Sequence, residues 1–365
     1  MSGQGYEQAG VKGQGEALSS IVRHLSPTLA LPEGAEVLTD FGGYASVLKV
    51  ADDLAIAIST DGVGTKTIIA SAMDRYDTIG FDCMAMNVND IICVGARPIA
   101  MVDYLGVHTL DPRRLEEILR GLGAAAKEAG VAIPGGELAQ LPEVIGSDGR
   151  SPGDDTAFDL VGTCIGTLHP EKMILGRSIE AGDTLIGIAS SGIHSNGLTL
   201  ARNVLLTRAG YRLDDEIGRL GCTLGEELIK PTEIYVRAAT ALWAAGVDTR
   251  GLVHITSDGF TNLCRLKASV GYDIDDLLEV PEIFRLIQEA GEVRGSEMYR
   301  VFNMGVGFVV VVPEDDAARG LQTLSEAGYD AGLIGHTNDD VGTVHLRGPG
   351  LVGRLDSGES SFTIV

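Results

Sequence analysis

The residues with the greatest chemical potential lie in a short polar segment at a strand-to-helix boundary. The segment Ser59-Thr60-Asp61-Gly62-Val63-Gly64-Thr65-Lys66 follows an apolar run over 54–58 and precedes a helix-like run over 67–73. Backbone N–H groups at such a turn can face phosphate oxygens, as can the N-terminus of the following helix. Asp61 offers oxygen ligands to Mg²⁺, and Lys66 offers positive charge to a phosphate group. The segment therefore predicts a nucleotide site, with a plain glycine-rich turn as the alternative.

Two familiar phosphate-binding motifs do not fit this segment. The Walker A pattern G-x-x-x-x-G-K-[ST] is absent from it, and a dinucleotide fingerprint would need a glycine where Thr67 stands. A phosphate site here would therefore be of another kind.

A second set of polar residues lies on the apolar helix predicted over 78–92. Asp82 and Asn89 are two helical turns apart and share one face, with Asp90 beside them. Carboxylates on such a helix need partners, because burying a free charge is costly. The helix therefore predicts either a metal site or a polar network that caps a neighbouring loop.

A third carboxylate follows a short predicted strand and a pair of glycines. Glu137 comes after Gly135-Gly136, so Asp61, Asp90 and Glu137 each stand at the end of an apolar element. Mg²⁺ sites for phosphoryl transfer use one or two carboxylates together with phosphate oxygens. The three acids predict such a site if the fold brings them together.

The segment 190–197 repeats the strand, turn and helix order of the first motif. It reads Ser-Ser-Gly-Ile-His-Ser-Asn-Gly, and its polar side chains include Ser191, His194, Ser195 and Asn196. The turn predicts an anion site for a substrate phosphate, with His194 as a donor or proton carrier. A simple N-cap at Ser195 or Asn196 is the alternative.

Two further polar turns follow along the chain. One is His254-Ile255-Thr256-Ser257-Asp258-Gly259, and the other is Phe302-Asn303-Met304-Gly305-Val306-Gly307. The glycines of the second turn are also typical of closely packed backbone. No Ser–His–Asp or Cys–His arrangement stands out, so the sequence gives no basis for covalent catalysis.

The bulk composition excludes several classes of protein. The chain has 365 residues and a formal net charge of −23, which argues against nucleic-acid and anionic-membrane partners but not against phosphorylated substrates. Its five scattered cysteines form no C-x-x-C pair and predict reduced thiols in a cytoplasmic protein. The polar N-terminus contains no apolar signal core.

The pattern of apolar residues predicts an α/β or α+β fold, because strands alternate with helices in both halves. The predicted strands cover 54–58, 97–105, 131–133, 158–168, 184–189, 252–256, 306–312 and 329–334. The predicted helices cover 15–25, 67–73, 78–92, 111–130, 197–206, 231–243, 281–290 and 315–327. The composition changes at 169–183, which places a domain boundary there. We expect an N-terminal arm and helix over 1–35, domains over 36–170 and 171–346, and a tail of low structural content over 347–365.

Taken in order, the motifs resemble the aminoimidazole ribonucleotide synthetase family, also called phosphoribosylformylglycinamidine cyclo-ligases. The resemblance runs from about residue 6 to residue 345. The segments that carry it are Thr60–Lys66, Tyr76–Gly80, Ala85–Asp90, Pro134–Glu137, Phe158–Gly162, Ser191–Gly197 and Glu297–Gly307. The segments 191–197 and 297–307 are specific, whereas the Asp-Gly-Val-Gly-Thr-Lys motif belongs to a wider ATP-using superfamily.

The resemblance implies two α/β domains and a homodimer whose N-terminal domains build a shared β-barrel. It also implies ATP with Mg²⁺ and a ribonucleotide substrate. In the family, ATP activates the formamide oxygen of formylglycinamidine ribonucleotide as a phosphate ester, a ring nitrogen attacks, and phosphate leaves. The products are aminoimidazole ribonucleotide, ADP and phosphate.

The roles that the resemblance implies are as follows. The metal ligands would be Asp61, Asp90 and Glu137. The ATP-binding residues would be Asp61, Gly62, Gly64, Thr65, Lys66 and Asn89. The substrate-binding residues would be Ser191, His194, Ser195 and Asn196, and the catalytic residues Lys66, His194 and His254.

Three segments depart from the family pattern. Lys12 replaces the acid of an Ala-Gly-Val-Asp loop, Ser257-Asp258-Gly259 replaces a run of three glycines, and the residues after Glu137 read Leu-Ala-Gln-Leu-Pro in place of Thr-Ala-Glu-Met-Pro. These departures keep two alternatives open. One is another ATP-dependent enzyme of the superfamily, such as a thiamine-phosphate kinase-like, hydrogenase-maturation-like or selenophosphate-synthetase-like protein. The other is a non-catalytic nucleotide-binding paralogue.

Overall fold

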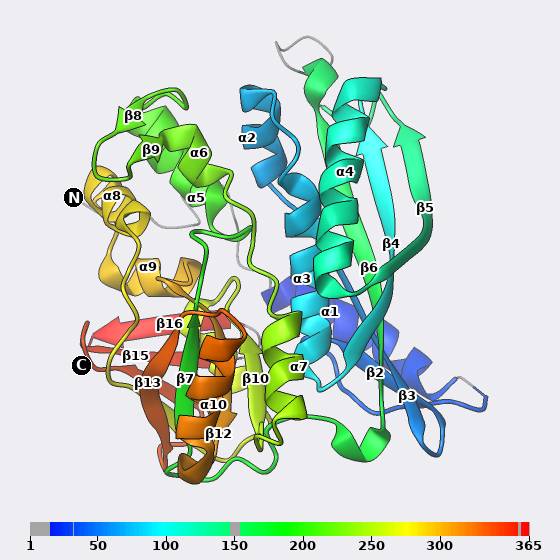
Figure 1. Ribbon diagram of the computed structural model, residues 1–365, viewed down its shortest axis with the longest axis vertical. Coiled ribbons are helices and arrows are strands. Elements are labelled where there is room, and N and C mark those ends of the chain that lie inside the picture. The colour runs from blue at the N-terminus through cyan, green and yellow to red at the C-terminus, as the bar shows by residue number, and fades with distance from the viewer. Residues whose placement is uncertain (1–14, 32, 147–153, 357–358, 365) are drawn as a thin grey trace.

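The computed structural model describes residues 15–31, 33–146, 154–356 and 359–364 and contains two mixed α/β lobes (Figure 1). Lys12 lies outside the described residues. The first lobe holds a six-stranded sheet in the order β1-β2-β3-β6-β4-β5. Its strands are β1 (Glu36–Val37), β2 (Ser46–Ala51), β3 (Leu54–Gly62), β4 (Arg97–Val107), β5 (Ala132–Gln140) and β6 (Phe158–Leu168). The α/β fold class is confirmed.

One face of this sheet is covered by helices and the other is open. Along β3, Ala55, Ala57 and Ser59 are buried. Leu54 and Ile58, which alternate with them, are exposed. This alternation follows the two-residue period of a strand. The covering helices are α2 (Lys66–Met73), α3 (Ile79–Cys93) and α4 (Pro112–Ala129), of which α3 contacts β3, β4 and β6.

The helices of the first lobe have recognisable start, stop and packing signals. Asp111 caps α4 by accepting the N–H groups of Arg113 and Arg114, and Gly130 ends the helix with φ 69°. Helix α3 packs against α4 at Gly121, where a Cβ would lie 2.2 Å from the carbonyl oxygen of Asp77. Only glycine allows so close an approach.

The second lobe is built on an eight-stranded sheet in the order β10-β12-β7-β13-β11-β14-β15-β16. Its strands are β7 (Thr184–Ala189), β10 (Gly251–His254), β11 (Gly271–Ile274), β12 (Val306–Val312), β13 (Ala331–Asn338), β14 (Thr343–Leu346), β15 (Leu351–Asp356) and β16 (Glu359–Ile364). Strand β12, between β10 and β7, is buried along its whole length. A separate small hairpin joins β8 (Glu216–Ile217) and β9 (Cys222–Thr223).

The remaining helices surround the second sheet, apart from one near the N-terminus. They are α1 (Gly15–Leu25), α5 (Leu198–Arg202), α6 (Leu224–Leu228), α7 (Val236–Ala244), α8 (Glu282–Gly291), α9 (Gly295–Val301) and α10 (Glu314–Glu326). A 3₁₀ helix spans Gly259–Arg265. None of the helices in the described ranges combines membrane-spanning length with an apolar sequence. The five cysteines are free thiols, three of them buried.

The structure corrects three predictions of secondary structure. The predicted helix over 231–243 begins only at Val236, and 231–235 has no regular secondary structure. Strand β5 runs from Ala132 to Gln140, so Glu137 lies within the strand and not after it. The predicted tail of low structural content contains β15 and β16, which extend the second sheet. In each case hydrogen bonds to distant segments decided a structure that the local pattern left open.

The segment Lys230–Tyr235, which has no regular secondary structure and is here called the strap, joins the two lobes. Asp82 of α3 accepts hydrogen bonds from the backbone N–H and the hydroxyl of Thr232, at 2.9 and 2.6 Å. The Lys66 ammonium lies 2.6 Å from the same carboxylate oxygen and also donates to the carbonyl of Lys230. Lys66 and Asp82 are both fully buried, so the ion pair forms the centre of the junction.

We predict that Lys66→Met destabilises the protein by about 3–5 kcal/mol, because it leaves the Asp82 carboxylate buried and unpaired. Chemical denaturation followed by circular dichroism measures this loss. The double variant Lys66→Met/Asp82→Leu is the matched control, and we expect it to recover part of the lost stability. A loss below about 1 kcal/mol in the single variant would contradict the central position of the pair.

Candidate functional site

Two carboxylates meet where β3 ends against helix α3. Asn87 of α3 fixes the backbone of Asp61, accepting its N–H at 3.0 Å and donating to its carbonyl at 3.1 Å. The Asp61 carboxylate accepts the Gly62 N–H at 2.7 Å. Burial, followed by the negative charge of Asp90, raises the pKa of Asp61 to about 6. The two carboxylates are therefore close enough to repel each other.

The second lobe contributes a histidine to this acidic pair. His254, at the end of β10, is fully buried, and its Nδ1 lies 3.0 Å from the Asp90 carboxylate. Asn89 lies 3.5 Å from the opposite ring nitrogen, while its side chain binds the strap at the carbonyl of Glu233 and the N–H of Tyr235. A proton on Nδ1 that is donated to Asp90 satisfies both contacts. The structure thus brings Asp61, Asn89, Asp90 and His254 together from two lobes.

A further carboxylate that sequence reasoning missed lies in the same row of the sheet. Asp61 pairs with Gly162 of β6, and Gly162 pairs with Asp103 of β4. Directly paired residues share a face, so Asp103 faces α3 as Asp61 does. Asn87 occupies the space above Gly162, where a Cβ would lie 2.6 Å from its amide nitrogen. The alternation of β4 was the only sequence signal for Asp103.

Glu137 lies apart from the other two predicted metal ligands. It is exposed on the edge strand β5 and pairs with Tyr104 of β4. Because Tyr104 follows Asp103, Tyr104 and Glu137 belong to the opposite face of the sheet from Asp61. Strands β6 and β4 also separate β5 from β3. Within one chain Glu137 does not join the acidic pair, and its metal role stays a prediction.

The first predicted motif forms the turn between β3 and α2. Gly64 has φ 71°, and the Thr65 hydroxyl lies 3.1 Å from that of Thr199 in the second lobe. Lys66 opens α2 but turns inward to Asp82, and burial lowers the pKa of its ammonium group, although Asp82 opposes this effect. In this arrangement the Lys66 ammonium is bonded to Asp82 in the interior, and its contact with a phosphate group stays a prediction.

The loop over 190–197 brings His194 into the interior. His194 has φ 66° and is buried, and its Nε2 accepts the Ser191 N–H at 3.3 Å. Burial, followed by the positive charges of His254 and Lys66, lowers the pKa of His194 well below its usual value. The neutral ring therefore carries its proton on Nδ1, which has no partner among the described residues. This N–H is a buried donor without an acceptor.

Of the other three predicted residues of this loop, two contact the junction between the lobes and one lies in the turn. The Ser191 hydroxyl donates to the carbonyl of Pro231 at 2.6 Å. Ser195 is buried, 3.3 Å from Asp82 and 3.2 Å from Thr232. Asn196 is half-buried in the turn. Ser191 and Ser195 thus connect the loop to the strap and to the Lys66–Asp82 pair.

The turn Phe302–Gly307 supports the loop from behind. Asn303 donates to the carbonyls of Gly192 and Ile193 and accepts the Ser190 hydroxyl at 3.0 Å. A Cβ at Gly307 would lie 2.0 Å from the Tyr235 hydroxyl and 2.6 Å from the His194 ring. The glycine is therefore required for the position of His194.

The acidic pair fits one Mg²⁺ ion. Within the described residues, no group of three or more His, Cys, Asp or Glu side chains is placed to hold a metal ion. Mg²⁺ commonly takes one or two carboxylates and fills its other positions with phosphate oxygens and water. Asp61 and Asp90 could provide those two carboxylates.

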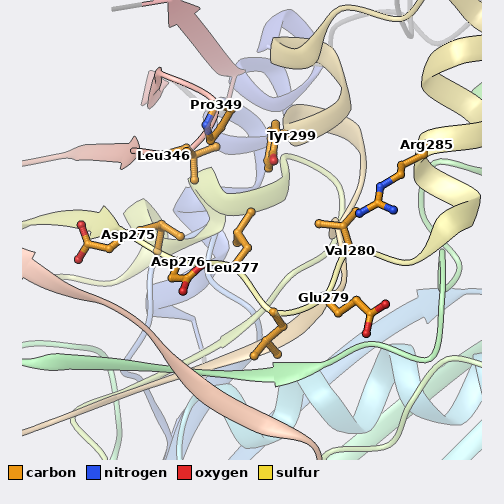
Figure 2. A pocket seen from close by; sticks show the side chains of 12 residues that line it. Asp275, Asp276, Leu277, Glu279, Val280, Arg285, Tyr299, Leu346 and Pro349 are labelled. Atoms are coloured by element: carbon orange, nitrogen blue, oxygen red, sulfur yellow. The ribbon is translucent and has the colours of Figure 1, made fainter.

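A pocket in the second lobe lies apart from the acidic pair. Figure 2 shows this pocket of about 500 Å³, with Leu277 and Val280 along its wall and Arg285 reaching in from α8. It shares no lining residue with the acidic pair or with the 190–197 loop. A smaller hollow of about 110 Å³ is lined by Tyr44, Cys93 and Arg265, beside the Tyr44 contact to the His254 backbone.

Comparison with known proteins identifies the family of this chain. The family profile "AIR synthase related protein, N-terminal domain" matches residues 42–168, and "AIR synthase related protein, C-terminal domain" matches residues 180–347. A protein of Methanobrevibacter smithii named phosphoribosylformylglycinamidine cyclo-ligase is 50% identical over 337 residues, covering 92% of this chain and 95% of the relative. A Bacillus mycoides protein of the same name is 40% identical, covering 94% and 98% of the two chains.

Solved structures share the fold at low sequence identity. The "Crystal structure of HypE-HypF complex" matches with a TM-score of 0.61 and 19% identity, covering 95% of this chain and 99% of that chain. The structure "AaThiL complexed with AMPPCP and TMP" matches with a TM-score of 0.60 and 15% identity, covering 92% and 94%. The two profile matches and the long relatives show that this chain belongs to the AIR synthase-related family, with the phosphoribosylformylglycinamidine cyclo-ligases.

Proposed function

We propose that this protein is an ATP-dependent cyclo-ligase that converts formylglycinamidine ribonucleotide to aminoimidazole ribonucleotide, with release of ADP and phosphate. Relatives that carry the cyclo-ligase name are 40–50% identical over at least 92% of this chain in three cases, which supports this activity. The observation that carries the proposal is the junction of Asp61 and Asp90 with His254, which both lobes are needed to build.

The reaction requires positioning and charge neutralisation more than a protein nucleophile. A formamide oxygen is a poor leaving group until a phosphoryl group is transferred to it. The nitrogen that becomes part of the new ring can then attack the formyl carbon, and phosphate leaves. In-line transfer depends on holding both reactants and on stabilising the charge that develops. Bound Mg²⁺ would neutralise the phosphate oxygens of ATP.

The residues of the chain would divide this work between the lobes. Asp61 and Asp90 would hold the metal, and His254 would orient Asp90 through its Nδ1 proton. The buried Nδ1–H of His194 would donate to an oxygen of the ribonucleotide once the substrate reaches it. The turn Gly62–Lys66 would lie against the phosphates of ATP, with the Lys66–Asp82 pair holding its helix in place.

The substrate side of the proposal rests on the loop that carries His194. We propose that Ser191, Ser195 and Asn196 bind the ribonucleotide phosphate. This loop is bonded to the strap through the Ser191 hydroxyl, and its backbone is held by Asn303. A fixed loop of this kind supports precise orientation of the bound substrate.

We further propose that the protein is a homodimer formed through the open face of the six-stranded sheet. This face carries Leu54, Ile58, Val102, Tyr104 and Ile165, each at least 36% exposed. Ile58 and Ile165 are directly paired, so the apolar surface crosses neighbouring strands. An exposed apolar surface of this extent is typical of a protein interface.

The central prediction is that purified protein forms aminoimidazole ribonucleotide and ADP in equal amounts from formylglycinamidine ribonucleotide, ATP and Mg²⁺. We expect Asp61→Asn to lower kcat at least about 100-fold, because it removes a charged metal ligand. Asp53→Asn, at an exposed carboxylate between β2 and β3, is the matched control and keeps full activity. ADP without the imidazole would indicate another acceptor, and neither product with ATP still bound would indicate a non-catalytic paralogue.

A second prediction concerns stability without ligands. Because the pKa of Asp61 is about 6 in the fold and 3.8 for an ordinary aspartate, ionisation of Asp61 disfavours the fold, and stability is lost as the pH rises from about 4 to 6. We expect Asp61→Asn to be more stable than the wild type by about 1–2 kcal/mol at pH 7. The gain disappears near pH 4, where the native carboxyl is protonated. Urea unfolding at both pH values measures it, and equal stability of the two proteins at pH 7 would contradict a cost of ionising Asp61 in its buried position beside Asp90.

A third prediction tests the dimer. Ile58→Asp places a charge on the apolar face and should convert the dimer to monomer, as measured by size exclusion with light scattering. Ile68→Asp is the matched control, because Ile68 is 46% exposed on α2, away from this face. A dimeric Ile58→Asp protein would place the interface elsewhere.

A further inference from the structure

The C-terminal hairpin of β15 and β16 reaches the polar loop that follows His254. These strands lie beyond residue 347, where the match to the family profile ends. Strand β16 packs against α9, and α9 packs against the 3₁₀ helix Gly259–Arg265. At Gly259 a Cβ would lie 1.9 Å from the carbonyl oxygen of Tyr299 in α9. The loop 254–259 is thus enclosed from this side by C-terminal elements.

One side chain connects the hairpin to this loop. Asp258 accepts the hydroxyl of Ser360 on β16 at 2.8 Å with one carboxylate oxygen. Its other oxygen accepts the Arg265 guanidinium at 3.0 Å. Asp258 has φ 77°, a left-handed conformation that disfavours residues other than glycine. The family pattern has glycine at this turn, so the aspartate keeps the same backbone and adds two side-chain bonds.

The contacts continue from Asp258 to His254. The Arg265 guanidinium lies 5.5 Å from the centre of the Tyr44 ring, in a cation–π arrangement. The Tyr44 hydroxyl donates to the backbone carbonyl of His254 at 3.0 Å. Asn262 donates to the carbonyls of Ser257 and Gly259, which holds the same loop from within. His254 is therefore fixed by its own backbone as well as by Asp90.

We propose that Asp258 and Ser360 are positioning residues for His254, so that the C-terminal hairpin serves the reaction by holding the His254 loop in register with Asp90. This inference rests on the proposed function for the meaning of the His254–Asp90 contact. Neither residue touches the acidic pair directly. We call the bonds of Asp258 with Ser360 and Arg265 the clamp. Loss of the clamp would reduce the fraction of molecules in which His254 orients Asp90. This change lowers kcat more than it weakens nucleotide binding.

Steady-state kinetics of the full-length variants test the proposal. Asp258→Gly keeps the left-handed backbone and removes both bonds, so we expect the fold to persist and kcat to fall about tenfold, with KM for ATP changing less than about twofold. Ser360→Ala should lower kcat in the same direction, and the double variant should be no worse than Asp258→Gly alone. Asp258→Asn tolerates the same backbone, retains an acceptor for Ser360 and should recover part of kcat. Ser361→Ala, on the neighbouring exposed residue, is the matched control.

Hydrogen exchange of residues 252–262, measured without substrate, tests the clamp separately from the proposed function. Faster exchange in Asp258→Gly and Ser360→Ala, but not in Ser361→Ala, supports the clamp. Unchanged exchange overturns the clamp whatever the kinetics show. If the wild type cyclises the substrate and the two variants match its kcat, the positioning role is overturned while the proposed function stands. If the wild type does not cyclise the substrate and exchange still responds, the proposed function fails and the clamp alone is supported.

Discussion

The buried ion pair between Lys66 and Asp82 is the interaction on which the site depends. It lies where α2 and α3 of the first lobe meet the strap Lys230–Tyr235 of the second. A buried pair depends on hydrogen bonds to its charges. Here Thr232 donates to one Asp82 oxygen and the Lys230 carbonyl accepts from Lys66, while the second Asp82 oxygen has no partner among the described residues. Its contribution is geometric, because Asp61 and Asp90 from one lobe meet His254 from the other only while the lobes keep this register.

The acidic pair illustrates how a binding site is built at a cost to stability. Burial and, to a smaller extent, the negative charge of Asp90 raise the pKa of Asp61 to about 6. A divalent cation bound there would offset the negative charge of the two carboxylates. The formal net charge of −23 does not prevent this, because distant surface charges are screened by salt whereas the local charges are not.

Much of the fold could be predicted from sequence, and the site only in part. Periodicity placed α3, β6, β7 and β12 within a residue or two, because their apolar patterns are long and uninterrupted. It failed over 231–235 and in the C-terminal hairpin, where bonds to distant segments decide the structure. The polar turns at 61–66 and 190–197 could be found because glycine, hydroxyl and charged residues are concentrated there. Asp103 and the inward turn of Lys66 could not, since sheet register and burial set both.

The most direct test follows the formamide oxygen of the substrate through the reaction. Formylglycinamidine ribonucleotide labelled with ¹⁸O at that oxygen is converted with ATP and Mg²⁺, and the released phosphate is examined by mass spectrometry. The proposed reaction predicts one ¹⁸O atom in each phosphate, because the phosphoryl group leaves together with the oxygen that it activated. Unlabelled phosphate accompanying aminoimidazole ribonucleotide would contradict phosphoryl transfer to the substrate, and with it the role assigned to the acidic pair.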